Sequence, residues 1–595
     1  MTTILRFLSR YARRNLPQYA LGGLMLLATN WVVVRIPVII GDALTVLETS
    51  GAASLRQTRS MALELMVLAG LVIVVRTLSR VLFFNPGRDI EYRVGLDVFG
   101  HLLTLQRPFF MKWKIGELVS VATNDTTSVR LLVGFAGLQV CNVAVAIPLH
   151  VWQMYATDPV LTLWCLAPIL FGAVYMRWTI KRFFGMIRDS MQLLARLSDR
   201  VLESYSGIGT IRAHAVEPAA AERFEERNAE YLRLMLRISS VRAFGMPVLA
   251  FSGLVGAATV LWIGGGRVID GDMAIGSMAT FTTLLISLVS ILTSLAWVLA
   301  AISRGIVAVS RVDGVLQARD ELPAVTDDAT IDAPPTMELR ALTFSYPDGD
   351  EPAIENLTAT VPAGGTLGIF GKTGSGKTTL VNLLARVHTP PPGTLFVDGH
   401  DVTTLSLSAY RDALAVVPQS AFLFSTTLRE NIRLASANPW KADADGVADD
   451  PRLDEVLQAA CLVDDIAQLP KGLQTVVGER GVMLSGGQRQ RASLARALYR
   501  TRPILLLDDV LSAVDQGTET KMVAAIRRLR AGTQAEKAPT TIIVSHRTSV
   551  LEHADEILVL EGGKVVERGT HAQLVAAGGE YAQTHLHQAE GGDDA

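Results

Sequence analysis

The stretch from Thr366 to Leu380 contains residue types that can bind phosphate groups. Thr366 to Phe370 form an apolar run with strand character, and the pattern G-x-x-x-x-G-K-[ST] follows it directly. The positions of this phosphate loop, with the residue after it, are Gly371, Lys372, Thr373, Gly374, Ser375, Gly376, Lys377, Thr378 and Thr379. The glycines allow backbone amides to turn inward around an anion, and the start of a following helix adds a positive dipole. We expect Lys377 to reach the β- and γ-phosphates of a nucleotide and Thr378 to offer a hydroxyl to Mg²⁺. A flexible glycine turn without a ligand is the alternative.

Two further segments could complete this chemistry. Asp508 ends the apolar run Ile504 to Leu507, and a carboxylate there can hold Mg²⁺ together with Thr378, although it could also cap a turn. A second segment, just before a helix-forming stretch, consists of Ser485, Gly486, Gly487 and Gln488. Its small residues would expose amides and a hydroxyl at the start of that helix, which predicts a second anion cradle.

Composition indicates more than one kind of domain. The 595 residues exceed what a single hydrophobic core supports, so we expect at least two domains. Hydrophobic residues make up 49% and charged residues 19% of the chain, and the long apolar runs lie in the first half. A formal net charge of -2 gives no reason to expect nucleic-acid binding. Cys141, Cys165 and Cys461 are too far apart to predict a disulfide framework or a metal site.

The first half predicts about six membrane spans, because that many segments approach the roughly 20 mostly apolar residues that crossing requires. They are Tyr19–Ile40, Met61–Phe84, Leu131–Tyr155, Val160–Met176, Val241–Ile263 and Met278–Ile302. Long charged connections follow the second and fourth spans, which predicts cytoplasmic helical extensions. The basic and apolar amino terminus predicts a helix on the cytoplasmic membrane surface.

Several polar residues within these spans would be costly in lipid. They are Arg35, Glu64, Arg76, Asn142, His150 and Gln153. Arg35 and Arg76 could favour an anionic group of a cargo. More often, such residues snorkel to the headgroups or pair with another helix.

The second half carries further short motifs in a defined order around the phosphate loop. They are FSYP with Tyr346, VVPQS with Gln419, LSGGQ at 484–488, ILLLDD at 504–509, SAVD ending at Asp515 and VSHR with His546. On these motifs the chain resembles the ATP-binding cassette (ABC) family, and with the six spans the resemblance to ABC exporters covers nearly all of it. The resemblance implies ATP and Mg²⁺ as cofactors. It also implies an all-α six-helix transmembrane domain with long intracellular helical extensions, followed by an α/β P-loop ATPase domain.

The resemblance also implies roles for single residues. Tyr346 would stack on adenine. Gln419 would contact Mg²⁺ or water, and His546 would hydrogen-bond the γ-phosphate or the attacking water. The cradle from Ser485 to Gln488 would face the γ-phosphate bound by the opposite subunit, so that two cassettes close head to tail, and Asp515 would help to join the two sites.

Segments that couple the two domains are implied in the same way. Both long cytoplasmic connections resemble the extensions of exporters, in which short coupling helices touch the ATPase domains. We expect these helices near Met111–Ser120 and His214–Phe224. The VGERG segment from Val477 is similar to the family's segment that contacts them.

One position departs from the family pattern. The residue after the metal-binding aspartate is usually a glutamate that polarises the attacking water, but here it is Asp509, one methylene shorter. A shortfall of about 1 Å in placing a catalytic group can cost on the order of 100-fold in rate. We expect a slow ATP site on this chain, unless the backbone shifts so that Asp509 works normally. The pattern resembles one half of heterodimeric multidrug-resistance-like bacterial exporters, which implies a partner subunit that carries the glutamate.

The predicted organisation is a transmembrane domain over 1–317, a linker over 318–336, an ABC domain over 337–587 and a disordered acidic tail over 588–595. We expect a multi-pass protein of the cell membrane whose amino terminus and ATPase domain are cytoplasmic. It would move small amphipathic or lipid-like substrates as a half-transporter, with membrane lipid around it and without nucleic acid. An ATP-gated channel or regulatory subunit, and an importer with the exporter fold, are the alternatives.

Overall fold

The computed structural model describes residues 2–50, 55–245, 247–319, 325, 327, 329–346, 349, 351–434, 450–478, 484–510, 516–532 and 538–590. They divide into two compact units. The first comprises Met1–Leu105 and Trp113–Arg319, and the second comprises Gln106–Lys112 and Asp320–Ala595.

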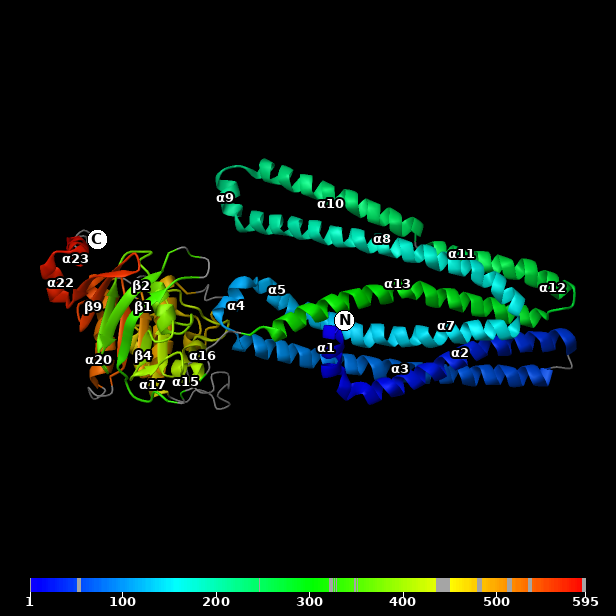
Figure 1. The fold of residues 1–595 in the computed structure, drawn as a ribbon, viewed down its shortest axis with the longest axis horizontal. Coiled ribbons are helices and arrows are strands. Elements are labelled where there is room, and N and C mark those ends of the chain that lie inside the picture. Colours follow the sequence, from blue (N-terminus) through cyan, green and yellow to red (C-terminus); the bar gives the residue numbers. More distant parts are fainter. Residues whose placement is uncertain are drawn as a thin grey trace. The chain divides into compact units, whose positions relative to one another are not determined.

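The first unit is built from long helices, as Figure 1 shows. In the described part of the chain, six helical stretches are long and apolar enough to cross a membrane. Their principal helices are α2 (Leu16–Ser50), α3 (Leu55–Thr104), α7 (Gly137–Thr157), α8 (Pro159–Ser206), α11 (Pro247–Thr259) and α13 (Ile275–Gln317). Further helices extend or connect them: α1 (Thr2–Ala12), α5 (Ile115–Ser120), η3 (Val121–Asp125), α6 (Thr126–Arg130), η4 (Leu131–Ala136), α9 (Ile208–Ala213), α10 (Glu217–Gly245), η5 (Val260–Gly264) and α12 (Gly265–Ile269). The six predicted spans fall on these stretches and are confirmed.

Two short connections are tied together by an ion pair. Asp158 lies between α7 and α8, and its Oδ1 accepts a hydrogen bond of 2.8 Å from the backbone N–H of Leu161, which caps α8 at its start. Pro159 follows at the first helical position, where its missing N–H costs nothing. Arg267, on α12, pairs with the nearly buried carboxylate of Asp158. This pair links the α7–α8 turn to α12.

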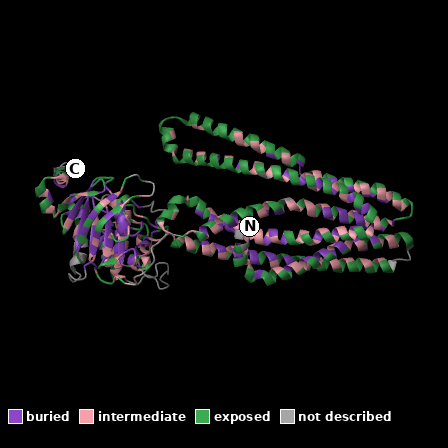
Figure 2. Cartoon of the chain, in the orientation of Figure 1, coloured by how far each residue is buried: buried purple, intermediate pink, exposed green. Residues whose placement is uncertain are grey.

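Small residues allow α2 and α13 to approach closely. A Cβ added at Gly41 would lie 2.4 Å from the backbone oxygen of Gly276, so a side chain larger than hydrogen does not fit there. Nearby, Thr280 Oγ1 donates a hydrogen bond of 2.9 Å to the carbonyl of Pro37. Much of the remaining surface of the long helices is exposed, as Figure 2 shows.

Short helices lie in or next to both expected coupling positions. α4 (Arg107–Lys112) overlaps the start of Met111–Ser120 and α5 lies within it, while α9 ends just before His214–Phe224. Pro108 favours a helix start at the first of these positions. At the second, Ala215 has a φ of +51°, so the backbone turns there before α10 begins at Glu217. The coupling role of both positions stays a prediction.

The second unit contains two sheets that share one core. The first is a four-stranded antiparallel sheet in the order β2-β1-β4-β5, formed by β1 (Met337–Phe344), β2 (Ile354–Val361), β4 (Leu395–Val397) and β5 (His400–Asp401). The second has six strands in the order β10-β9-β3-β8-β7-β6, formed by β3 (Thr366–Phe370), β6 (Leu414–Val417), β7 (Ile504–Asp508), β8 (Thr540–Val544), β9 (Glu556–Glu561) and β10 (Lys564–Gly569). Every residue of β3 and β7 is buried, as central strands covered on both faces require.

Helices flank this larger sheet. They are α14 (Lys377–Leu384), α15 (Leu407–Asp412), α16 (Leu428–Arg433), α17 (Pro451–Ala459), α18 (Val463–Gln468), α19 (Gly486–Tyr499), α20 (Gln516–Gly532), α21 (Thr548–Leu551), α22 (His571–Ala577) and α23 (Glu580–Glu590). Because β3, β7 and β8 pair in parallel, their carboxyl ends meet at one edge of the sheet. The residues that follow these strands are therefore brought together. The predicted α/β fold after a six-helix membrane domain is confirmed.

Both ends of the second unit contact the rest of that unit. In the predicted linker, the Asp327 carboxylate contacts His400 Nδ1 at 2.5 Å, and the carbonyl of Pro335 accepts a hydrogen bond of 2.6 Å from Thr540. Residues 588–590 belong to α23, so a disordered tail from Gln588 is wrong for them. Hydrogen bonds from the Gln588 side chain, described below, hold this last turn.

Candidate functional site

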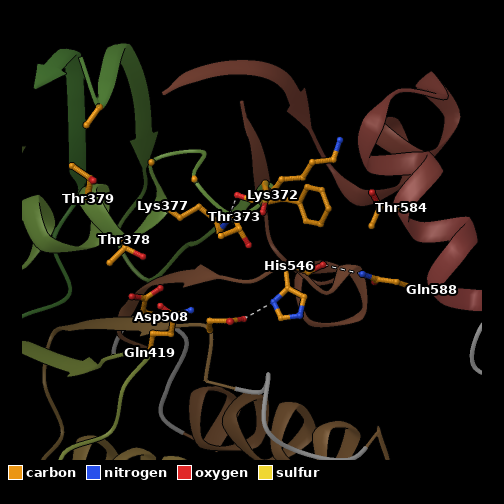
Figure 3. Close-up of a pocket in the computed structure, with 16 residues that line it drawn as sticks. Lys372, Thr373, Lys377, Thr378, Thr379, Gln419, Asp508, His546, Thr584 and Gln588 are labelled. Atoms are coloured by element: carbon orange, nitrogen blue, oxygen red, sulfur yellow. Dashed lines mark hydrogen bonds and ion pairs between the residues drawn. The ribbon is translucent and has the colours of Figure 1, made fainter. Parts of the chain in front are cut away.

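An open cavity of about 880 Å³ lies at the carboxyl edge of the larger sheet (Figure 3). Its lining comes from the loop after β3, the residues after β7 and β8, and α23. The residues are Ala353, Phe370, Gly371, Lys372, Thr373, Gly374, Gly376, Lys377, Thr378, Thr379, Gln419, Asp508, Asp509, His546, Thr584 and Gln588. The structure therefore brings together most of the predicted nucleotide-binding and catalytic residues.

The phosphate loop has the backbone shape that its glycines permit. Gly374 and Gly376 have φ values of +86° and +100°, a region that residues with a side chain rarely adopt. A Cβ at Gly376 would also lie 2.6 Å from the carbonyl oxygen of Ala353. Gly376 is the residue before α14, so the loop leads directly into the exposed amides at the start of that helix.

Lys377 lies over the loop in the first turn of α14. Its Nζ donates hydrogen bonds to the carbonyl oxygens of Gly371, at 2.6 Å, and Lys372, at 2.7 Å. Burial lowers the pKa of Lys377, while the carboxylates of Asp509 and Asp508 act in the opposite direction. The ammonium group is thus held at the cavity wall, within the field of two acidic side chains.

Asp508 provides a buried carboxylate at the end of β7. Burial, and next the negative charge of Asp509, raise the pKa of Asp508 to about 6, against the opposing effects of Lys377 and a backbone hydrogen bond from Gln419. Two neighbouring carboxylates, those of Asp508 and Asp509, favour the binding of a cation beside them. Thr378 and Gln419 line the same cavity and add a hydroxyl and an amide oxygen.

These oxygen-bearing groups fit Mg²⁺, which is usually held by one or two carboxylates together with substrate phosphates. Among the described residues no cluster of three or more His, Cys, Asp or Glu side chains could hold a metal by itself. Any Mg²⁺ here would therefore depend on the nucleotide for much of its coordination. Thr378, Asp508 and Gln419 would be its protein ligands.

Asp509 and His546 both line the cavity and form a pair. Figure 3 labels His546 and marks its interactions with dashed lines. His546 Nδ1 donates a hydrogen bond of 2.9 Å to Asp509 Oδ1. Asp509 has a φ of +50°, and its N–H donates to the carbonyl of Val544, so the backbone that carries the carboxylate is fixed. Gln490 Nε2 adds hydrogen bonds to the carbonyl oxygens of Gln419 and Asp509, at 3.3 and 3.4 Å.

The carboxyl-terminal helix α23 contributes residues that the motifs do not predict. Gln588 Nε2 donates to the backbone carbonyl of His546 at 2.9 Å, and Gln588 Oε1 accepts from the N–H and hydroxyl of Thr548 at 2.9 and 3.0 Å. Glu580 pairs with Lys372 of the phosphate loop at 3.2 Å. The sequence offers little indication that Gln588 and Glu580 contact cavity residues, because acidic residues follow α23. Only the helical character of 580–590 could have indicated a packed element.

Tyr346 and Ser375 do not line the cavity. The ring of Tyr346 packs edge-on against Phe344 and His388, with centroids 5.3 and 5.4 Å away. Its hydroxyl lies 3.2 Å from Thr379 Oγ1, which places Tyr346 beside the cavity wall. Ser375 is buried within the loop.

The LSGGQ segment lies away from this cavity. Ser485 caps α19, because its Oγ accepts a hydrogen bond of 3.2 Å from Gln488 N while Gln488 Oε1 accepts one of 2.9 Å from Ser485 N. Ser485 and Gly486 are exposed at the start of the helix, whereas Gly487 is buried. Asp515 lies outside the described residues, as do 479–481 of VGERG.

The arrangement can bind a polyphosphate and activate a water molecule. Loop amides and Lys377 can hold the phosphates, and Asp508 with Thr378 can hold a divalent cation beside them. Asp509 and His546 line the same cavity, and a carboxylate and an imidazole are groups that can accept a proton from water. Ser485 is exposed and does not line this cavity.

The comparisons with known proteins cover both units. The description "ABC transporter transmembrane region" matches residues 19–292, and "ABC transporter" matches residues 354–512. The chain is 30% identical to a probable multidrug resistance ABC transporter ATP-binding/permease protein, YheI, of Bacillus subtilis, over 99% of the chain and 98% of the relative. It is 31% identical to the multidrug resistance-like ATP-binding protein MdlA of Escherichia coli, over 98% and 96%. It is also 30% identical to the ATP-dependent lipid A-core flippase of Salmonella typhimurium, over 82% of each chain.

A solved structure supports the fold alone. The structure of a bacterial Atm1-family ABC exporter with ATP bound matches with a TM-score of 0.80 and 24% identity, over 97% of this chain and 99% of that one.

Proposed function

The chain belongs to the ABC transporter family, and we propose that it is the slow-site subunit of a heterodimeric exporter of amphipathic or lipid-like substrates. Its ATPase domain is coupled to transport, and its membrane domain is multi-pass. Asp509 carries the proposal, because in the motif resemblance it stands where the family usually has glutamate, and its shorter carboxylate hydrogen-bonds His546. Residence in the cell membrane is part of the same proposal.

ATP binding would proceed through the residues of the cavity. The loop amides and Lys377 bind and orient the phosphates, and Tyr346 stacks on the adenine ring after moving from its packing on Phe344 and His388. Mg²⁺, when bound, neutralises charge on the phosphates. Thr378, Asp508 and Gln419 hold it in place.

Hydrolysis on this chain would be slow for a geometric reason. Asp509 Oδ1 is engaged by His546, and its side chain reaches one methylene less far than glutamate. The carboxylate therefore accepts a proton from the attacking water at a longer distance, which lowers the rate without removing the function.

The cradle from Ser485 to Gln488 would complete the partner's site. Its exposure supports this, since a helix start with free amides on the surface can approach a γ-phosphate on a second subunit. Asp515 would help to join the two sites across the same interface. ATP-driven closure of the two cassettes would then turn the membrane helices from inward to outward access.

ATPase measurements on the purified chain, alone and with a glutamate-bearing partner, test the asymmetry. We expect little turnover from the chain alone and vigorous turnover from the pair. Ser485→Arg in this chain should then remove most of the pair's activity, because it obstructs the partner's competent site, while ATP binding to this chain's own loop persists. Vigorous turnover by a homodimer would refute the asymmetric assignment.

A channel or regulatory ABC subunit is the rival function, since a slow ATP site also suits gating. An importer with the exporter fold is a second rival. The relatives named for multidrug resistance and for flipping lipid A-core favour export. ATP-dependent accumulation against a gradient separates a transporter from a channel, and its direction separates exporter from importer.

A further inference from the structure

A carboxylate outside the sequence motifs holds the start of α19. Asp465 belongs to α18, and each of its two oxygens contacts a side chain of α19. Its Oδ1 accepts a hydrogen bond of 3.0 Å from Gln488 Nε2, and its Oδ2 pairs with Arg491 Nη2 at 2.5 Å. Gln488 and Arg491 are three residues apart, so they lie on one face of the helix. One carboxylate therefore ties the first turns of α19 to α18.

The contacts of Asp465 are largely shielded from water. The side chain of Asp465 is 19% exposed and that of Arg491 is 13% exposed. A charged acceptor forms a stronger hydrogen bond with an amide than a neutral acceptor does, and a buried donor that loses its acceptor keeps the full cost of desolvation. Asp465 therefore restrains the side chain of Gln488.

The other end of the Gln488 side chain acts on Ser485. Gln488 Oε1 accepts the hydrogen bond from Ser485 N, and Ser485 Oγ accepts the one from Gln488 N, which together form the capping box of α19. Leu484, just before the cap, is buried in the core and anchors the chain on that side. Because both ends of the Gln488 amide are engaged, turning this side chain toward a nucleotide on another subunit would break both of its hydrogen bonds.

The capping box also decides which donors remain for a ligand. It uses the N–H groups of Ser485 and Gln488. The N–H of Gly486, the first residue of α19, has no acceptor within the helix. The hydroxyl of Ser485 accepts in the capping box, so its own proton can still be donated elsewhere. Ser485 and Gly486 are both exposed, so these two donors remain at the surface for a phosphate group.

We propose that Asp465 and Gln488 are positioning residues for the ATP site of the partner subunit. Asp465 holds the Gln488 side chain, Gln488 holds Ser485, and the hydroxyl of Ser485 and the N–H of Gly486 bind the γ-phosphate on the partner. Gln488 then acts through Ser485 and not by contact with the nucleotide. The step to the partner's γ-phosphate rests on the proposed function, whereas the contacts from Asp465 to Ser485 do not.

Steady-state ATPase measurements on the purified pair of this chain and its glutamate-bearing partner test the assignment, because turnover there reports mainly the partner's site. Asp465→Ala should lower kcat by about tenfold, because the cradle loses its fixed position. Asp465→Asn keeps an acceptor for Gln488, so it should lower kcat by only about threefold. ATP binding by this chain alone, titrated by calorimetry without Mg²⁺, should be unchanged in both variants, since Asp465 does not line the nucleotide cavity.

A double-mutant cycle separates positioning from a general loss of structure. In a chain that already carries Gln488→Ala, adding Asp465→Ala should lower kcat no further, because Asp465 acts through Gln488. Asp464→Ala is the matched control, since Asp464 is the neighbouring carboxylate in α18 and is exposed. Its kcat should stay within about twofold of that of the unaltered pair.

Strictly additive losses in the cycle, an unchanged kcat in Asp465→Ala, or an equal loss in Asp464→Ala would overturn the proposal. If Asp465→Ala does not assemble with the partner, Asp465→Asn goes through the same cycle and is judged by the same outcomes. Vigorous turnover by this chain alone would refute the slow-site assignment instead. The same variants would then be measured in the homodimer, where Ser485 also completes the site of a second subunit.

Discussion

The pairing of Asp509 with His546 is the residue-scale feature on which the proposed slow ATP site depends. The hydrogen bond of 2.9 Å and the φ of +50° fix the carboxylate from both its side chain and its backbone. A backbone shift that would let Asp509 act like glutamate meets resistance from the hydrogen bond between Asp509 N and Val544 O. The residue therefore has little freedom to extend toward a water molecule.

Replacing Asp509 by Glu should increase ATP hydrolysis at this chain's own site. We expect a gain of about 10- to 100-fold in single-turnover rate, because the carboxylate moves closer to the attacking water. Isolating this site requires a partner whose own phosphate-loop lysine is replaced. Asp509→Asn serves as the control and should lower the rate, since an amide cannot accept the proton. An unchanged rate in Asp509→Glu would show that side-chain length was not limiting.

At the scale of elements, the motifs predict the phosphate loop well because its chemistry requires glycines and a lysine at fixed spacing. Gly376 illustrates this, since both its φ and the nearby Ala353 carbonyl exclude a side chain. The contribution of α23 could not be predicted in the same way. Gln588 reaches His546 and Thr548 only through the folded chain, because these residues lie 42 and 40 positions away in the sequence. No local pattern encodes such contacts.

Helix α23 should position the segment that carries His546. Gln588→Ala removes hydrogen bonds to His546 and Thr548, so we expect kcat to fall several-fold with KM for ATP little changed. Gln583→Ala is the control, because Gln583 is exposed on the same helix. A matching fall in the control, or a change in KM alone, would argue against positioning through His546.

Helix α4 belongs to the second unit, and its preceding residue Gln106 accepts a hydrogen bond of 3.0 Å from Arg411. If α4 has the proposed coupling role, Gln106→Ala should lower the stimulation of ATPase activity by substrate several-fold while basal activity is retained, because Gln106 does not line the nucleotide cavity. Arg411→Ala also loses a bond to the carbonyl of Arg386 and should be more severe. A double-mutant cycle measures the pair, and strictly additive effects would show that the two residues act independently.

At the scale of the whole molecule, the sequence predicts the division into membrane and ATPase units because composition changes sharply between them. The six spans follow from apolar length, and the α/β class of the second half follows from its motifs and its alternation of strand-like and helix-like runs. The bounds of α4 and α9 could not be predicted from the sequence, because helices this short end at local backbone turns such as the one at Ala215, which has a positive φ. The sequence of one chain also cannot show the ligand of Ser485, because the proposed ligand is a nucleotide bound to another subunit.

The most direct test of the account is substrate flux in proteoliposomes that contain the chain and its glutamate-bearing partner. The account predicts ATP-dependent accumulation of an amphipathic substrate in vesicles whose ATPase domains face outward, against its gradient. Replacement of the partner's phosphate-loop lysine should abolish that accumulation, while Lys377→Ala in this chain should reduce it by preventing closure. Flux that runs only down the gradient, at a rate independent of ATP hydrolysis, would contradict the account and favour a channel.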